Sequence, residues 1–428
     1  MRPDPATPKR DHTGFLSQFI PEQSLPRRLV AVRFAAAMGK GVLLSGSVVY
    51  FTLHVGLTAA EVGIGLSASG FAALASSVTF GIITDRVRKR ALLFLQFLVV
   101  AVGFGLYSLV HNPIEFYLLV MVIAFFDAGM SPTEGAIVAA LIPPAERVRL
   151  NAMMRSVFNV GFSVGIGLAA VAATSSRLLV LIPIGAALLL GLAALLVTRL
   201  PADVPTRRPA VRPRRFGALR DLRYVAVVGI SSVLAAHMTL LMVVLPLWTL
   251  NRTDVPHYVV PLFLVINTGF VILLQVWASR GAETVSGAAR IARRAGVWIA
   301  LGCGAVAVTT AVHHPAVIVV AIMVAVLAMS LAEILQSSSA WGLAFGLAPS
   351  HAKGEYLGTF DLHIVAQNII GPVILSGLVM SQGIWGWAVI AAVVLLAAWL
   401  IVPAARRSAD SMAALTTPDD VAERAGTA

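Results

Sequence analysis

GIITDRVRKR, residues 81–90, separates two long apolar runs and decides the fold class of this chain. Five charged side chains crowd a connection that is too short to form a domain of its own: Asp85, Arg86, Arg88, Lys89 and Arg90. The apolar runs before and after it have the length of membrane-spanning helices. The stretch therefore predicts a tight turn at a membrane surface that holds two transmembrane helices in register.

The composition of the whole chain supports a membrane protein. Of its 428 residues, 58% are hydrophobic and only 12% are charged, whereas soluble domains carry about 25% charged residues. Twelve spans of about 20 residues need about 240 residues, which the length allows. The net charge of +12 would suit a nucleic-acid partner in a soluble protein. Because the basic residues cluster between apolar runs, as the topology rule for membrane proteins predicts, we expect no nucleic acid.

Apolar runs bounded by charges, Pro and Gly predict twelve helices in two groups of six. Their expected ranges are 29–53, 60–83, 91–110, 114–141, 150–173, 178–198, 224–249, 257–279, 293–312, 316–347, 355–380 and 384–403. One long linker, rich in Arg and Pro, divides them. We therefore expect an N-terminal tail, a six-helix bundle, the basic linker, a second six-helix bundle and a C-terminal tail, over residues 1–28, 29–198, 199–223, 224–403 and 404–428.

The distribution of basic residues predicts the orientation in the membrane. If both termini are cytoplasmic, only Arg177 and Arg252 of the 32 Lys and Arg residues fall in loops on the opposite side. The reversed orientation would place nearly all of them outside. Since positive charge is retained on the cytoplasmic side, we expect cytoplasmic termini and a cytoplasmic central linker.

The charged turn at residues 81–90 resembles the loop between the second and third helices of the major facilitator superfamily, G-x-x-x-D-R-x-G-R/K-R/K. Gly81, Asp85, Arg86, Lys89 and Arg90 match this pattern, whereas an arginine replaces its second glycine. The resemblance implies an all-α membrane protein with the major facilitator fold, two six-helix bundles around a midplane site. It also implies that the loop, mainly through Asp85, Arg86 and Arg90, makes charge contacts that stabilise the outward-open state.

Three further segments resemble bacterial, in particular actinobacterial, drug-efflux members of this superfamily: RSVFNVG at 155–161, LPLW at 245–248, and EILQ at 333–336 followed by WGL at 341–343. This branch implies proton-coupled export across the bacterial cytoplasmic membrane. Two residues depart from it. Phe125 stands where many proton-driven exporters have an arginine, and Ile166 stands where antiporters tend to have a proline. Both departures weaken the prediction of antiport and leave that of transport intact.

Several charged side chains are expected inside the spans, where each costs about 2.5–3.5 kcal/mol unless it faces a cavity or a partner. Asp127 and Glu134 in span four lie seven residues apart and so share one helix face. Lys40 in span one is expected either to pair with Asp127 or to attract an anionic substrate. Glu134 is expected to bind a proton or a cation, or to pair with Arg155 or Arg149.

Glu333, in the apolar middle of span ten with Gln336 one turn further on, is the main candidate for proton coupling. Burial disfavours a carboxylate, so such a group can load and release a proton near neutral pH. The alternative is a glutamate that only locks two helices together. His237 in span seven is either a second titratable group or a helix–helix hydrogen-bonding residue.

The remaining candidates are polar residues near the cytoplasmic ends of spans. Arg155 and Asn159 of span five are expected to line the polar cavity, although contacts between helices explain an asparagine equally well. Asp361, at the start of span eleven, is expected to pair with the basic loops as part of a gate.

These observations favour a secondary active transporter that works by alternating access. No G-x-x-x-x-G-K-S/T phosphate-binding loop occurs, so its energy would come from an ion gradient. Proton-coupled export of a hydrophobic or amphipathic small molecule is the preferred form, and uptake or facilitated diffusion of a metabolite is the alternative. A membrane-embedded enzyme is less favoured, because no His-rich or paired-acid loop is present. We expect a monomer in the lipid bilayer, with a small-molecule substrate, protons as coupling ion, and neither cofactor nor metal.

Overall fold

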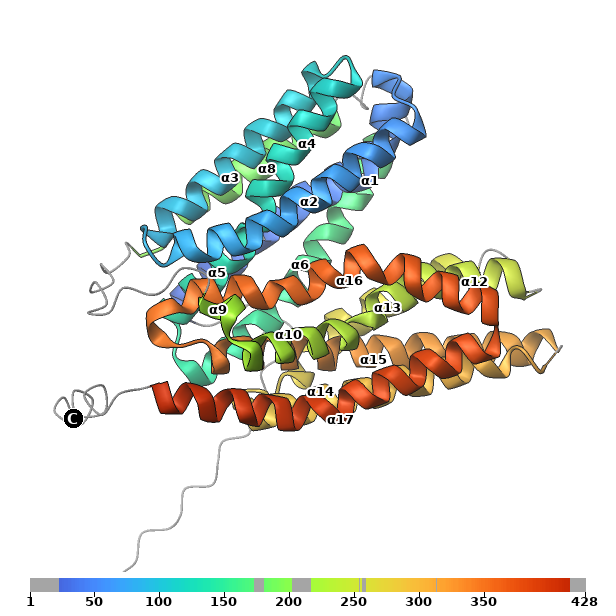
Figure 1. Ribbon diagram of the computed structural model, residues 1–428. Coiled ribbons are helices and arrows are strands. Elements are labelled where there is room, and N and C mark those ends of the chain that lie inside the picture. Colours follow the sequence, from blue (N-terminus) through green and yellow to red (C-terminus); the bar gives the residue numbers. More distant parts are fainter. Residues whose placement is uncertain are drawn as a thin grey trace, which may run out of the picture.

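The computed structural model describes residues 23–172, 181–201, 217–253, 255, 259–312 and 314–415, which form helices and no strands. The helices fall into two groups (Figure 1). The first group contains α1 (Ser24–Val49), α2 (Ala59–Thr84), α3 (Lys89–Leu106), α4 (Pro113–Ala128), α5 (Met130–Leu141), α6 (Pro144–Ala172) and α8 (Leu181–Val197). The second contains α9 (Gly217–Arg220), α10 (Leu222–Leu234), α11 (Ala236–Thr239), α12 (Leu245–Arg252), α13 (Val259–Ala278), α14 (Val285–Val308), α15 (Pro315–Leu347), α16 (Lys353–Gln382) and α17 (Ile384–Leu415).

Over the described residues, each group contains six long helical segments, in the order that the sequence predicts. Some segments consist of short elements joined end to end, such as α4 with α5 and α10 with α12. Eight segments of the described chain are long and apolar enough to cross a membrane by themselves. Shorter apolar helices lie within α2, α8 and α13. The remaining long helix of the first group is α1. The fold is therefore the expected all-α arrangement of twelve spans in two six-helix bundles.

Several helices extend past the predicted apolar runs. α1 begins at Ser24 rather than at residue 29, and α6 begins at Pro144 rather than at residue 150. α14 begins at Val285 rather than at residue 293, and α17 continues to Leu415, beyond the predicted end at 403. Hydropathy marks the part of a helix that lipid covers, whereas backbone hydrogen bonding continues into the polar interface. The predicted ends were too short for this reason.

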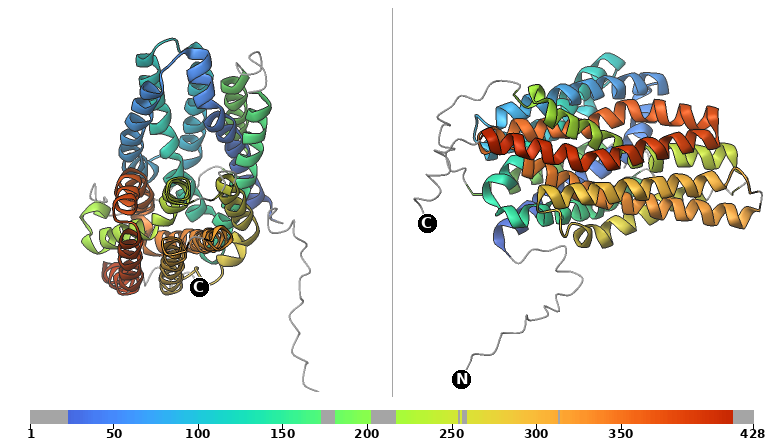
Figure 2. Two further views of the ribbon diagram at one scale, coloured as in Figure 1. Left: turned by 90° about the vertical axis from the view of Figure 1, so that its right-hand side faces the viewer. Right: turned by 60° about the horizontal axis from the view of Figure 1, so that its bottom comes forward.

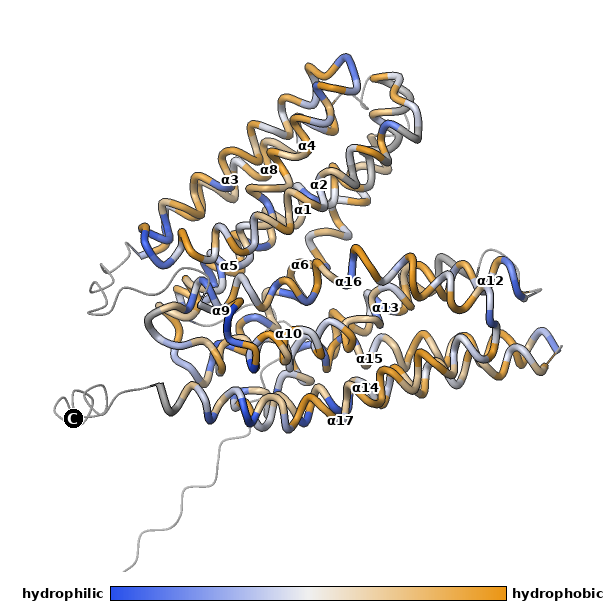
Figure 3. Tube along the Cα trace, viewed as in Figure 1, coloured by the Kyte–Doolittle hydropathy of each residue, from blue (hydrophilic) through white to orange (hydrophobic). Residues whose placement is uncertain are grey.

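The two groups meet at one end of the molecule and diverge toward the other (Figures 1 and 2). At the meeting end, α2 and α5 pack on α16, and α6 packs on α13 and α15. α9 and the C-terminal end of α17 also lie at this end, which we call the closed end. Hydrophilic residues gather there, whereas the diverging helices are mostly hydrophobic (Figure 3). The linker of residues 202–216 lies outside the described residues.

Each group has its own apolar core. Leu93, Phe97 and Phe116 are fully buried in the first core. Tyr224 and Trp387 are fully buried in the second. Buried apolar surface of this kind stabilises each bundle independently of the contact between them.

The segment that holds two of the candidate acids is interrupted between α4 and α5. Pro132 lacks a backbone N–H and so cannot bond to the carbonyl four residues earlier. The helix is interrupted close to that point, at Gly129. The Thr133 hydroxyl donates to the Gly129 carbonyl oxygen at 2.9 Å, which satisfies a backbone group at the break. Asp127 therefore lies before the break and Glu134 after it.

Candidate functional site

Arg155 and Glu333 form an ion pair between the two groups of helices. Arg155 lies on α6 of the first group and Glu333 on α15 of the second, and an Arg155 Nη2 donates to Glu333 Oε1. The Glu333 side chain is 10% exposed and that of Arg155 is 28% exposed. The other carboxylate oxygen, Oε2, accepts from Asn267 Nδ2 of α13 at 2.7 Å. Glu333 is thus not surrounded by apolar side chains alone, as the sequence suggested, but is bound by polar groups from two neighbouring helices.

Three other residues predicted for the site lie near this ion pair. His237 of α11 is buried within electrostatic range of both Glu333 and Arg155, and its Nδ1 lies 3.1 Å from the Leu234 carbonyl oxygen. Gln336 is also buried, less than one turn along α15 from Glu333. Asn159 is half-buried and lies one turn from Arg155 on the same face of α6. The structure therefore gathers these predicted residues around one inter-group ion pair.

Two further ion pairs connect α1 with α4 and α5 inside the first group. Lys40 Nζ lies 2.6 Å from Asp127 Oδ1, which confirms the predicted Lys40–Asp127 pair. The contact is electrostatic and lacks hydrogen-bond geometry. Glu134 Oε2 accepts from Arg33 Nη1 at 2.9 Å. The alternative that Glu134 pairs with Arg155 or Arg149 was wrong, because its ion-pair partner is Arg33 and Arg155 reaches across to the other group.

The spacing of these residues explains the pairing. Arg33 and Lys40 are seven residues apart on α1, and Asp127 and Glu134 are seven residues apart on the opposing segment. Seven residues are about two helical turns, so each pair of side chains lies on one helix face. Because α1 and the α4–α5 segment run in opposite directions, Arg33 meets Glu134 and Lys40 meets Asp127. The Arg33 guanidinium also lies over the Phe158 ring, 4.8 Å from its centroid.

Asp361 lies where α16 faces the first group. It interacts with Ser131 of α5 and is within electrostatic range of Arg33 and Glu134. The sequence suggested that it pairs with the basic loops, and the structure corrects this. Because Asp361 lies more than two turns inside α16, it faces the helices of the first group rather than the charged turn.

The charged turn at residues 81–90 reaches the start of α16 through one carboxylate. Asp85 Oδ1 accepts from the Gly354 backbone N–H at 2.8 Å, and Oδ2 accepts from that of Glu355 at 2.9 Å. The first N–H groups of a helix have no partner within it and carry partial positive charge, so a carboxylate there is stabilising. Glu355 in turn accepts through Oε1 from the Ala218 N–H of α9 at 2.9 Å. A chain of contacts thus joins α2, α16 and α9 at the closed end.

Glycines allow α2 and α16 to touch backbone to backbone. A Cβ atom added at Gly81 would lie 2.7 Å from the Gly354 carbonyl oxygen. One added at Gly358 would lie 2.3 Å from the Ser77 carbonyl oxygen. Real Cβ atoms do not approach backbone atoms so closely, so any side chain here would force the helices apart. Gly81 therefore serves the inter-group contact, in agreement with its place in the predicted gating loop.

The basic members of the turn behave differently from Asp85. Arg86 is exposed and lies within electrostatic range of Glu355. Lys89 is buried at the start of α3. Arg90 Nη1 donates to the Leu200 carbonyl oxygen at 3.0 Å and so holds the end of α8 within the first group. Asp85 and Gly81 contact the second group directly, whereas the Arg90–Leu200 contact lies within the first group.

Sequence reasoning did not assign a role to Arg33, Gly354, Gly358 or Glu355. Two signals in the chain indicate Arg33 and the two glycines, and none indicates Glu355. The spacing of Arg33 and Lys40 matches that of Asp127 and Glu134. Small residues also recur at four-residue spacing on both partner helices, as Ser77 with Gly81 and as Gly354 with Gly358. Such small-xxx-small patterns let membrane helices approach closely.

The fold and this polar inter-group contact define a multi-pass membrane transporter. The family model of the Major Facilitator Superfamily matches residues 29–366, and the chain belongs to this superfamily. It is accordingly a transporter and not an enzyme. No curated protein matches the chain by sequence.

Solved structures share the fold at low sequence identity. An Escherichia coli fucose:proton symporter is 14% identical, with a TM-score of 0.69 over 90% of this chain and 98% of its own. A bacterial homologue of the iron transporter ferroportin, solved in an outward-facing state, is 15% identical, with a TM-score of 0.67 over 91% of this chain and 100% of its own. The human organic anion transporter MFSD10 is 17% identical, with a TM-score of 0.63 over 89% of this chain and 100% of its own.

Proposed function

We propose that this transporter works by alternating access and exports a hydrophobic or amphipathic small molecule in exchange for protons. The observation that carries the proposal is the Arg155–Glu333 ion pair. It links the two groups, and both side chains retain some exposure. A ligand or a proton that competes for either partner would change the free energy of the contact between the groups.

The proposed cycle starts from the conformation described above. With both termini cytoplasmic, as the basic residues predict, the closed end is cytoplasmic and the groups diverge toward the outside. Two similar structures, one of the ferroportin homologue and a second one of the fucose transporter, are in outward-facing conformations. An opening toward the outside in this transporter is compatible with them. Protonation of Glu333 from the outside would weaken its attraction to Arg155. The groups 29–198 and 224–403 would then rock as bodies and open the cytoplasmic end.

We also propose that the protein is a monomer in a bacterial cytoplasmic membrane and belongs to the drug-efflux branch of the superfamily. These proposals rest on the resemblance of residues 155–161, 245–248 and 333–336 to that branch. The alternative is uptake or facilitated diffusion of a metabolite. It is favoured by Phe125 and Ile166, which depart from the pattern of proton-driven exporters.

Transport assays on the purified protein in liposomes distinguish proton-coupled export from uptake or facilitated diffusion. The experiment imposes a proton gradient, presents a panel of lipophilic cations and zwitterions, and records proton movement and substrate flux together. For an exporter, we expect substrate movement against the direction of proton flow, and little flux without the gradient. Flux that is independent of the gradient would support facilitated diffusion and contradict proton coupling.

The Glu333→Gln variant tests the assigned coupling residue. Glutamine keeps the shape of the side chain and can still accept from Asn267, but it carries no charge and does not titrate. We expect substrate binding to persist and coupled proton flux to be lost. Glu283→Gln is the matched control, because this glutamate is exposed in the turn between α13 and α14. Unchanged coupling in Glu333→Gln would remove Glu333 from the mechanism.

A further inference from the structure

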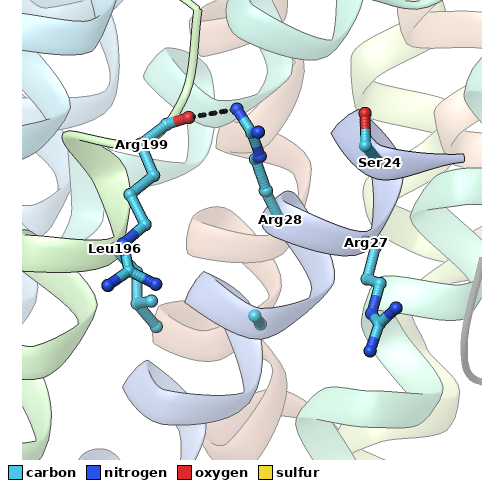
Figure 4. Close-up of a pocket in the computed structure, with 6 residues that line it drawn as sticks. Ser24, Arg27, Arg28, Leu196 and Arg199 are labelled. Carbon is cyan, nitrogen blue, oxygen red and sulfur yellow. Dashed lines mark hydrogen bonds between the residues drawn. The ribbon is translucent and has the colours of Figure 1, made fainter.

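A cavity in the first group is not used by any role described above. It lies between the first turns of α1 and the last turn of α8 and has a volume of about 650 Å³. Its lining residues come from both helices (Figure 4). They are Ser24, Arg27, Arg28, Ala31, Leu196 and Arg199.

Three guanidinium groups give this cavity a strong positive charge. Arg27, Arg28 and Arg199 are all exposed, and no lining residue is acidic. The ion pairs formed among the described residues involve other side chains. Arg28 Nη1 donates to the Arg199 carbonyl oxygen at 2.6 Å, which ties the chain at the end of α8 to the first turns of α1. Guanidinium forks bind phosphate oxygens in a bidentate manner, so the cavity suits a phosphate-type anion.

An apolar face of α8 leads up to the cavity. Leu188, Leu192 and Leu195 are 70%, 47% and 63% exposed, respectively. Their spacing of four and then three residues places them on one side of the helix. The next residue, Leu196, already lines the cavity. A ligand that fits both features carries a phosphate at one end and hydrocarbon at the other.

We propose that the Arg27–Arg28–Arg199 cavity binds the phosphodiester headgroup of an anionic phospholipid, with its acyl chains along Leu188, Leu192 and Leu195. Its position at the helix ends matches the depth of a headgroup at the membrane surface. Basic residues next to a membrane attract anionic lipids. Because Arg28 and Arg90 both hold carbonyl groups at the end of α8, a bound headgroup would fix this corner of the first group against the membrane surface.

Native mass spectrometry of the full-length protein in detergent tests this site. The protein is titrated with phosphatidylglycerol and with phosphatidylcholine of the same acyl chains. We expect phosphatidylglycerol to bind more tightly. We also expect the Arg27→Gln/Arg28→Gln/Arg199→Gln variant to lose affinity for it on the order of a hundredfold, since each arginine near the membrane surface contributes about fivefold.

The control is Arg290→Gln/Arg294→Gln/Arg406→Gln, which removes three exposed arginines from the second group. Equal phosphatidylglycerol affinity in the two triple variants would overturn the proposal. Displacement of the lipid by inorganic phosphate at equal concentration would also overturn it, because the site would then recognise a free anion.

A single variant keeps the test valid if the triple variant does not fold. Arg199→Gln leaves the backbone carbonyl that accepts from Arg28 and removes only one guanidinium. We expect about a fivefold loss of phosphatidylglycerol affinity with an unchanged unfolding temperature. Wild-type affinity in this variant would contradict the assigned site.

Discussion

The two groups of helices touch through contacts of different chemistry. Where α2 meets α16, backbones pack directly on each other at glycines, and the Asp85 carboxylate binds two backbone N–H groups. Where α6 meets α15, two long side chains, Arg155 and Glu333, reach across to each other. The first contact depends on close approach and exists only when the helices are together. In the proposed cycle, the second exchanges one partner for a ligand or a proton while the helices move.

We propose that this difference gives the two contacts separate tasks. The α2–α16 contact is made largely of backbone groups and one carboxylate, so it would determine whether the closed end can form. The α6–α15 contact contains charges whose partners can change, so it is the one that a ligand can influence. The corresponding connection in the second group, between α13 and α14, lies against α6 through apolar Ala282 and Val148 rather than through a carboxylate.

The largest effect is expected from separating the charges of the α6–α15 contact. Arg155→Gln would leave Glu333 buried without its cation, at a cost of about 3–5 kcal/mol, and we expect transport to fall more than about a hundredfold. The Arg155→Gln/Glu333→Gln double variant removes both charges and should recover most of the stability without recovering transport. Thermal unfolding and liposome flux measure the two quantities. Recovery of both would show that the pair has a structural role only.

A smaller effect is expected from keeping α2 and α16 apart. In Gly358→Ala the new Cβ would lie 2.3 Å from the Ser77 carbonyl oxygen, so the closed end should open. The probe is a cysteine introduced by Ser77→Cys in a Cys303→Ala background, because Ser77 is buried at this contact.

We expect alkylation of the cysteine at position 77 to be at least about tenfold faster with Gly358→Ala, which corresponds to about 1.4 kcal/mol. Gly167→Ala serves as the control, since a Cβ there meets nothing within 4 Å. Equal rates in the two backgrounds would mean that the glycine contact does not control closure.

The smallest effect is expected from neutralising Asp85. In Asp85→Asn one amide oxygen can still accept from the start of α16, but the charge that interacts with the helix end is lost. Such contacts contribute about 1 kcal/mol, so the population of the closed end should fall about fivefold. The same cysteine assay at position 77 measures this change. Transport should decrease while abundance in the membrane stays near normal, and wild-type transport would contradict a gating role for Asp85.

The local pattern of the chain was sufficient to predict the fold. Apolar runs of spanning length, the central basic linker and the GIITDRVRKR turn predicted twelve helices in two bundles. Hydropathy could not locate the helix ends, because α6, α14 and α17 continue through polar turns. It also could not place Arg290 or Arg406 inside helices, since both lie where the helices leave the apolar layer.

The candidate site was predictable only in part. Lys40 was expected either to pair with Asp127 or to attract an anionic substrate, and the structure shows the pair at 2.6 Å. The seven-residue spacing indicates Arg33 as the partner of Glu134 only once the Lys40–Asp127 pair is known. The partner of Glu333 was not predictable, because several arginines lie at compatible positions along the chain. Which one reaches each acid depends on how α1, α5, α6 and α15 face one another.

The sequence by itself determined which segments enter the membrane and which residues there carry charge, because both follow from the free energy of transferring side chains into lipid. Only the tertiary structure decided that Arg33 meets Glu134 inside one bundle, whereas Arg155 crosses to Glu333 in the other. Ion pairs form over a few ångströms between residues more than a hundred positions apart, and their choice of partner depends on helix packing that no local pattern encodes.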